Sequence, residues 1–297
     1  MIRRVAYIAG GMAAAIPVLA AVGCSPDELP AATDPIPEPD TPLPPTEAAV
    51  ASPSAANAPR SPLSVTEGDP AVVTDRIRFA AGDAEIAAYL ARPAQAGPHP
   101  AMLVCHENRG LNPHIEDLAR RFAKAGYVAL ALDLLSREGG TAAHDRDEVP
   151  GLLNAAGPER HVADFAAGLA HLQGLSEVDP ERIGMNGYCF GGGITWRCAT
   201  AIPELKAAVP FYGPAPDLAA VPAIRAAVFG VYAELDERVN ASKDDLERAL
   251  VDAGVTHRMT VYPGVNHAFH NDTGERYDEA QALAAWTDML AWLDAYV

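Results

Sequence analysis

The glycine-rich stretch MNGYCFGGGITWR, residues 185–197, constrains the fold more than any other part of the sequence. An apolar run leads into Cys189, and a helical pattern begins directly after it. Gly187 and Gly191 flank the cysteine, as small residues must where a strand turns sharply into a helix. The pattern predicts a strand, a tight turn that exposes the Cys189 side chain, and a helix whose positive N-terminal end faces the sulfur. The alternative is a structural cysteine buried in an ordinary glycine-rich turn.

Strands and helices alternate along the rest of the chain. Apolar runs predict buried strands over residues 101–107, 127–134, 206–213 and 226–236, and residues 177–189 predict a strand that ends at Cys189. Amphipathic segments predict helices over residues 112–126, 159–172, 242–254 and 277–296, with Asn112 and Ser242 as N-caps. Residues 72–93 predict a hairpin at the sheet edge, with its turn at Ala81 to Asp83. Such alternation implies a mostly parallel sheet covered by helices on both faces, in which ligands bind beyond the carboxyl ends of the strands.

The charge balance limits the partners of the chain. There are 22 basic and 39 acidic residues, which give a net charge of −17. A surface of this sign repels nucleic acid, so we expect no nucleic-acid partner. The 49% of hydrophobic residues are enough for a sizeable core, and residues 63–297 suit one α/β domain.

The N-terminus has the layout of an export signal. Arg3 and Arg4 precede an uncharged run over residues 5–23, which ends at Cys24. The sequence AVGC resembles the cleavage box of bacterial lipoprotein signals, which predicts an export signal over residues 1–24 and a lipid on Cys24. We therefore expect an exported bacterial protein, periplasmic and anchored to a membrane. An ordinary cleaved signal and an uncleaved anchor are the alternatives, and the paired arginines leave the Sec and twin-arginine routes open.

Residues 25–62 form a spacer in this interpretation. They contain eleven prolines and no aromatic residue, a composition typical of a disordered linker. Such a linker would hold the folded domain away from the membrane surface.

A nucleophilic cysteine needs a base that is held in place, and the chain offers both partners. Asp236 ends the predicted strand 226–236, and His267 follows in a loop before the last helix. An acid and then a histidine, in this order after the nucleophile, is the arrangement of α/β-hydrolases. We expect Cys189 to attack, His267 to act as base and acid, and Asp236 to orient it. The alternatives are a helix cap at Asp236, a surface position for His267, and a role for His270 in its place.

Four stretches resemble the dienelactone hydrolase family of α/β-hydrolases, whose members use cysteine where most relatives use serine. They are HENRGLNPHIEDLARRFAKAGYVALALDLLS, GYCFGGG, ELD and NHAFHNDTGERYDEAQALAAW. The resemblance covers nearly the whole predicted domain. It implies the α/β-hydrolase fold, an ester or lactone as substrate, and an acyl-thioester intermediate.

The resemblance also implies further site residues. A glutamate at the position of Glu107 contacts the cysteine and accepts its proton when substrate arrives, and the alternative for Glu107 is a salt bridge with Arg109. The backbone N–H groups of Phe190 and Asn108 match the two donors to the oxyanion.

One departure from the family concerns the substrate. Members that degrade dienelactone bind its carboxylate through an arginine, and Asn271 stands at that position here. Arg137, Arg146 and Arg160 are candidates for a second arginine of that site. The sequence therefore argues against dienelactone itself. Two other functions stay open: an esterase or acyl transferase that uses the same residues, and a binding protein, for which a broken triad would be expected.

The remaining reactive residues suggest no cofactor. Cys105 lies in a predicted strand and Cys198 in a predicted helix, where both act as small apolar side chains. His267, His270 and Asp272 lie close together in the sequence, but no second cluster has zinc-like spacing. We expect neither a metal nor a cofactor, and the oligomeric state stays open.

Overall fold

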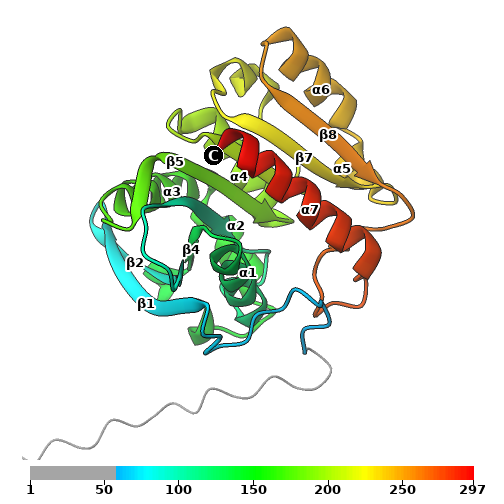
Figure 1. Cartoon of the computed structure of the whole chain (residues 1–297). Helices are drawn as coiled ribbons and strands as arrows, with labels where there is room; N and C mark the ends of the chain where they lie inside the picture. Colours follow the sequence, from blue (N-terminus) through cyan, green and yellow to red (C-terminus); the bar gives the residue numbers. More distant parts are fainter. Residues whose placement is uncertain (1–57) are drawn as a thin grey trace, which may run out of the picture. The chain divides into compact units, whose positions relative to one another are not determined.

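The computed structural model describes residues 58–297, and the predicted export signal, Cys24 and most of the predicted spacer lie outside them. The described chain contains one eight-stranded sheet in the order β1-β2-β4-β3-β5-β6-β7-β8 (Figure 1). Its strands are β1 (Val72–Ala81), β2 (Ala84–Pro93), β3 (His99–Cys105), β4 (Val128–Leu132), β5 (Val178–Tyr188), β6 (Ala207–Phe211), β7 (Ala227–Ala233) and β8 (His257–Tyr262).

The strand directions match the predicted architecture. Strand β2 pairs antiparallel with both β1 and β4, and every other neighbouring pair of strands is parallel. The β1–β2 hairpin turns at Gly82 and Asp83, and Gly82 has a φ of 64°, which glycine adopts without strain. The expected hairpin and the mostly parallel sheet are therefore confirmed.

Seven α-helices connect or follow the strands in the described residues: α1 (Pro113–Lys124), α2 (Val149–Ala156), α3 (Pro158–Gln173), α4 (Phe190–Ala201), α5 (Glu237–Asn240), α6 (Lys243–Asp252) and α7 (Glu279–Tyr296). Short 3₁₀ turns lie at η2 (Ser136–Glu138), η3 (Thr141–Ala143) and η4 (Leu218–Ala223). Asn112 caps α1 as predicted, because its side chain accepts the N–H groups of His114 and Ile115. Ser242 occupies the N-cap position of α6 but makes no capping bond, since its hydroxyl donates to the Val239 carbonyl.

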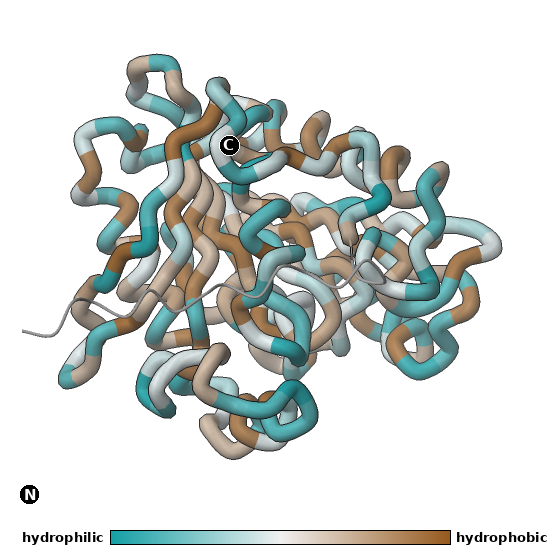
Figure 2. The backbone as a smooth tube through the Cα atoms, turned by 90° about the horizontal axis from the view of Figure 1, so that it is seen from below, coloured by the Kyte–Doolittle hydropathy of each residue, from teal (hydrophilic) through white to brown (hydrophobic). Residues whose placement is uncertain are grey.

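Two hydrophobic layers hold the sheet between the helices. Helices α1 and α7 pack on one face through side chains such as Phe122 and Trp286, whose rings lie 4.9 Å apart. Helices α3, α4 and α6 pack on the other face, with Phe165 and Leu246 fully buried. Figure 2 shows the hydrophobic stretches gathered in the central strands and the hydrophilic ones in the outer loops. Among the described helices, none is both long enough and apolar enough to span a bilayer.

The N-terminal segment, residues 60–65, is bound to the domain. The Ser61 N–H donates to Asp272 Oδ2 at 3.0 Å, and the Val65 N–H donates to Asp117 Oδ1 at 2.7 Å. Arg60 Nε donates to the Asp272 carbonyl at 3.0 Å. Residues 60–62 are thus already part of the folded domain, whereas the sequence predicted that the domain begins at residue 63.

Candidate active site

The turn after β5 presents Cys189 in a strained conformation. Its φ of 58° and ψ of −115° lie in a region that residues other than glycine rarely adopt. A Cβ on Gly187 would lie 2.3 Å from the Gly191 carbonyl oxygen, and a Cβ on Gly191 would lie 2.5 Å from the His106 oxygen. The flanking glycines are therefore required by close backbone approach, as predicted, and Cys189 is the N-cap of α4.

The loops after β7 and β8 are joined beside this turn. The Leu235 N–H donates to the Val265 carbonyl at 2.9 Å, and the Gly264 N–H donates to Glu234 Oε2 at 2.7 Å. These bonds hold together the two loops that carry Asp236 and His267. Two residues that are 31 positions apart in the sequence are thereby placed side by side.

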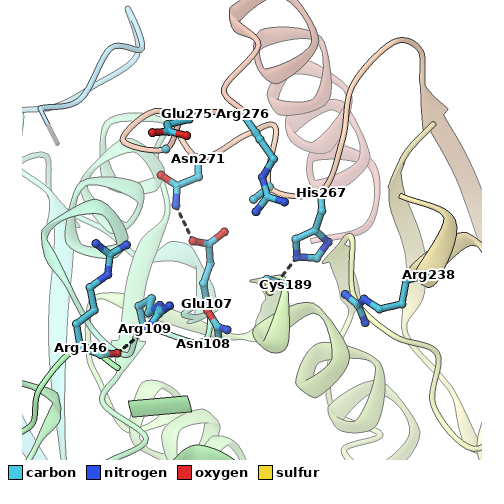
Figure 3. Close-up of a pocket in the computed structure, with 12 residues that line it drawn as sticks. Glu107, Asn108, Arg109, Arg146, Cys189, Arg238, His267, Asn271, Glu275 and Arg276 are labelled. Carbon is cyan, nitrogen blue, oxygen red and sulfur yellow. Dashed lines mark hydrogen bonds between the residues drawn. The ribbon is translucent and has the colours of Figure 1, made fainter. Parts of the chain in front are cut away.

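A continuous chain of contacts links the three predicted residues. His267 Nε2 lies 3.0 Å from Cys189 Sγ, and His267 Nδ1 lies 2.5 Å from Asp236 Oδ2. Figure 3 shows His267 above the cysteine at the floor of the pocket. Asp236 Oδ1 also accepts the Val239 N–H at 3.4 Å, so the aspartate caps α5 and holds the histidine at the same time. Asp236 can therefore be both a helix cap and the residue that orients His267.

Burial and, to a smaller extent, the negative charge of Glu107 raise the pKa of Cys189, which is about 11. Three groups act in the opposite direction: the backbone N–H groups of Phe190 and Asn108, which point at the sulfur, and the charge of Arg238. The thiol is consequently protonated near neutral pH until its proton passes to a base. The two predicted oxyanion donors converge on the reacting atom.

Glu107 is held by Asn271 instead of by the cysteine. Asn271 Nδ2 donates to Glu107 Oε2 at 2.6 Å, and Asn271 Oδ1 accepts the Thr273 hydroxyl at 2.7 Å. The structure shows no hydrogen bond between Glu107 and Cys189 in the described residues, so the expected direct contact is not formed. The alternative pairing with Arg109 does not form either, since Arg109 Nη1 contacts Asp147 Oδ1 at 3.0 Å. Glu107 Oε1 is buried without a hydrogen-bond partner in the described residues.

The sequence interpretation missed Tyr212. It follows β6 at a φ of 36°, and its ring lies 5.0 Å from the His267 ring. Its hydroxyl is buried and has no hydrogen-bond partner among residues 58–297. Burial raises the pKa of Tyr212, and the nearby charge of Glu107 adds to the effect, so the hydroxyl stays protonated. The sequence signal that could have identified Tyr212 is its position at the carboxyl end of a predicted buried strand.

His270 and Asp272 are buried and do not line the pocket. His270 is buried, stacks on Tyr188 at 5.2 Å, and has a pKa lowered by burial and by the charge of Arg121. Asp272 Oδ2 lies 2.6 Å from Arg121 Nη2, and its Oδ1 lies 3.0 Å from His114 Nδ1. Within the described chain, no three histidine, cysteine or acidic side chains are grouped so that they could hold a metal ion. Cys105 and Cys198 are free and buried.

The pocket above Cys189 has a volume of about 560 Å³. Its charged lining residues are Glu107, Arg109, Arg146, Arg238, Glu275 and Arg276. Of the three arginines considered from the sequence, only Arg146 lies there. Arg137 is paired with Asp164 at 2.7 Å, and Arg160 is paired with Glu138 at 2.6 Å.

The sheet order and the strained strand-to-helix turn define an α/β-hydrolase fold. Comparison with known proteins makes this more specific. The sequence profile of the dienelactone hydrolase family matches residues 86–297. A relative from Methylorubrum extorquens, named "putative carboxymethylenebutenolidase", is 32% identical over 238 residues, which are 76% of this chain and 82% of the relative. A relative of the same name from Escherichia coli is 32% identical over 254 residues, 80% of this chain and 93% of the relative.

Solved structures of similar proteins have the same fold. The crystal structure of a "putative dienelactone hydrolase" from Klebsiella pneumoniae has a TM-score of 0.71 and 32% identity, and the match covers 76% of this chain and 100% of that one. A dienelactone hydrolase-like promiscuous phosphotriesterase from metagenomic libraries shares the fold, with a TM-score of 0.68 at 22% identity over 76% of this chain and 99% of its own. The chain belongs to the dienelactone hydrolase family and is a hydrolase. The predicted family and fold are confirmed.

Proposed function

We propose that the protein cleaves an ester or lactone through an acyl-thioester on Cys189. The observation that carries the proposal is the unbroken contact from Cys189 Sγ through His267 to Asp236 Oδ2. This contact provides a path for the thiol proton and a carboxylate to stabilise the imidazolium that forms.

The first half of the reaction forms the thioester. The thiol proton moves to His267 Nε2, and the sulfur attacks the substrate carbonyl carbon. The carbonyl oxygen becomes an oxyanion that accepts the N–H groups of Phe190 and Asn108, an interaction typically worth about 3 kcal/mol per donor. When the tetrahedral intermediate collapses, His267 returns the proton to the leaving alkoxide.

The second half releases the acid. His267 takes a proton from water, the hydroxide attacks the thioester carbon, and the thiol leaves with that proton. No cofactor takes part in these steps. Because the pKa of Cys189 is raised, the resting thiol is protected from other electrophiles until the donors and the base act together. Glu107 becomes available as a further proton acceptor when the substrate breaks its bond to Asn271.

Hydrolysis of p-nitrophenyl acetate, p-nitrophenyl butyrate and a carboxylated enol lactone tests the proposal. We expect Cys189→Ala to abolish turnover, and Arg78→Gln, a change at an exposed position on β1, to leave it intact. Mass spectrometry of quenched wild-type protein should find the acyl group on the peptide that contains Cys189. Equal turnover by wild type and Cys189→Ala would refute cysteine catalysis. Equal inertness of two folded proteins would favour a binding function for the cleft.

We also propose that the chain is exported and anchored through a lipid on Cys24. The support is the arginine pair, the apolar run and the AVGC sequence that precede the spacer. In this arrangement the hydrolase domain works in the periplasm beside a membrane.

A further inference from the structure

We infer that the pocket accepts an acyl compound with two anionic groups, one on each side of the reacting carbonyl. Arg238 would bind one group, and Arg276 would bind the other, while Arg146 lies farther from the cysteine, beyond Glu107. The inference rests on the proposed function, because it takes Cys189 as the position of the carbonyl carbon. Its support lies in where these arginines are and in what they lack.

The three arginines come from three separate segments. Arg146 lies in the loop between η3 and α2, Arg238 lies in α5, and Arg276 lies in the loop between β8 and α7. All three line the same pocket as Cys189. No single element explains their convergence, so the fold brings three independent positive charges to one cavity.

These arginines form no ion pair with any residue in the described part of the chain, and all three are exposed. Several other arginines of the domain are paired: Arg109 with Asp147, Arg137 with Asp164, and Arg160 with Glu138. In a chain with a net charge of −17, acidic partners are abundant. Guanidinium groups left unpaired around one cavity are therefore available to bind a ligand.

The arginines lie on different sides of the cysteine. In Figure 3, Arg238 lies beside Cys189 and His267, while Arg146 and Arg109 lie across the pocket beyond Glu107. Arg276 extends from the upper loop between Glu107 and His267, so that His267 lies between it and Arg238. In the inference, one anion lies beside Arg238 and the other beside Arg276, with the reacting carbonyl between them. An acyl carbonyl placed at Cys189 would thus have a guanidinium group available on each side.

The chemistry favours carboxylates. A guanidinium group donates two parallel hydrogen bonds to a carboxylate, and such charge-assisted pairs are the stronger hydrogen bonds of proteins. The positive pocket in an acidic surface also draws anions inward. The ligand class is an ester or lactone with a carboxylate on the acyl half and another on the alcohol half.

Calorimetric binding of inert acids tests the inference without turnover. The full-length Cys189→Ala protein is titrated with succinate, adipate and suberate, and with hexanoate as the monoacid matched to adipate. We expect the best diacid to bind about tenfold more tightly than hexanoate, since each charge-assisted pair is worth about one tenfold step. Adding Arg238→Gln or Arg276→Gln should remove this advantage, and adding Arg78→Gln should not. The inference would be overturned if no diacid bound more tightly than hexanoate. It would also be overturned if Arg238→Gln left the tighter binding of the diacid unchanged.

Turnover provides the second test. The substrates are phenyl acetate, 4-acetoxybenzoate, phenyl hydrogen succinate and 4-carboxyphenyl hydrogen succinate, which carry no acid, one on either half, or one on both. We expect the doubly acidic ester to have the highest kcat/KM. Arg238→Gln should lose the preference for an acid on one half of the ester, acyl or alcohol. Arg276→Gln should lose the preference for an acid on the other half. Loss of the same preference in both variants would mean one anion site and would contradict the inference.

The two proposals fail in different ways. If phenyl acetate hydrolysis does not depend on Cys189, the proposed function is wrong, and the calorimetric titration still decides about the anion sites. If phenyl acetate hydrolysis depends on Cys189 and diacids have no advantage, only the inference of two anion sites is wrong.

Discussion

The negative charge of Glu107 disfavours ionisation of the neighbouring Cys189 thiol. Its carboxylate accepts a bond from Asn271 and, through its charge, disfavours the thiolate of Cys189. The same position was expected to contact the thiol directly. In the structure the carboxylate instead accepts the Asn271 amide through Oε2 at 2.6 Å, and its other oxygen has no partner in the described residues.

We expect Glu107→Gln to lower the pKa of Cys189. Glutamine can still accept the Asn271 amide, while the negative charge that disfavours the thiolate is gone. The rate of iodoacetamide alkylation of Cys189 near pH 8 should rise about tenfold. The pH dependence of alkylation gives the pKa, and Glu275→Gln, at the same pocket, is the matched control. A slower reaction in Glu107→Gln would instead assign Glu107 to activation of the resting thiol.

Asp236→Asn should separate the two roles of Asp236. Asparagine can still accept the Val239 N–H and cap α5, so the folded state should keep its stability. It cannot hold His267 in the required tautomer or stabilise the imidazolium, and kcat should fall about a thousandfold or more. Steady-state kinetics beside thermal unfolding measures both effects. A large drop in Tm with unchanged kcat would mean that the aspartate serves only as a cap.

At the scale of elements, the alternation of apolar and amphipathic segments was enough to predict the sheet and most helices. Residues 136–156 were not assigned, because short turns interrupted by Gly139, Gly140 and Pro150 carry no helical period. The order of Cys189, Asp236 and His267 was readable because each follows a strand. The convergence of Arg146, Arg238 and Arg276 was not readable, because it depends on the paths of three loops.

Asp272 joins three elements in one buried ionic cluster. Burial alone would raise its pKa, but the contact with His114 and the charge of Arg121 hold the pKa well below the ordinary 3.8. Loss of the charge would leave Arg121 short of a partner, so Asp272→Asn should destabilise the fold by about 3 kcal/mol. Urea unfolding measures this, with the exposed Asp244→Asn as control. Equal effects of the two changes would contradict a structural role for the cluster.

The same cluster predicts a pH dependence. A carboxyl with a lowered folded-state pKa stabilises the fold above its unfolded pKa, and this stabilisation is lost as the pH falls through the folded value. Wild-type stability should therefore decrease more steeply than that of Asp272→Asn below about pH 4. Parallel unfolding curves of the two proteins over this range would show that Asp272 does not carry the effect.

At the scale of the whole molecule, the N-terminal segment belongs to the domain. Val65 is 2% exposed, and Ser61 is bound to Asp272. A chain that starts at residue 67 should have a lower Tm than one that starts at residue 58, by several degrees, because it loses these bonds and the burial of Val65. Equal Tm values would show that the segment adds nothing to the fold.

The predicted export signal implies that the protein is attached to a membrane through Cys24, and cell fractionation can test this. We expect Cys24→Ser to release the protein from the membrane fraction and to abolish incorporation of labelled palmitate. Cys198→Ser, a change far from the signal, is the control. Labelling that persists in Cys24→Ser would mean that the lipid is attached at another residue, and absence of labelling in the wild-type protein would contradict lipidation.

The attachment of residues 60 and 61 has a mechanical consequence. Arg60 donates to the carbonyl oxygens of Asp272 and Gly274, and Ser61 donates to the Asp272 carboxylate. A pull on the chain ahead of Arg60 is therefore borne first by the loop that carries His267 and Asn271, and only afterwards by the sheet. The load on a tether would reach the reacting groups before it reached the hydrophobic core.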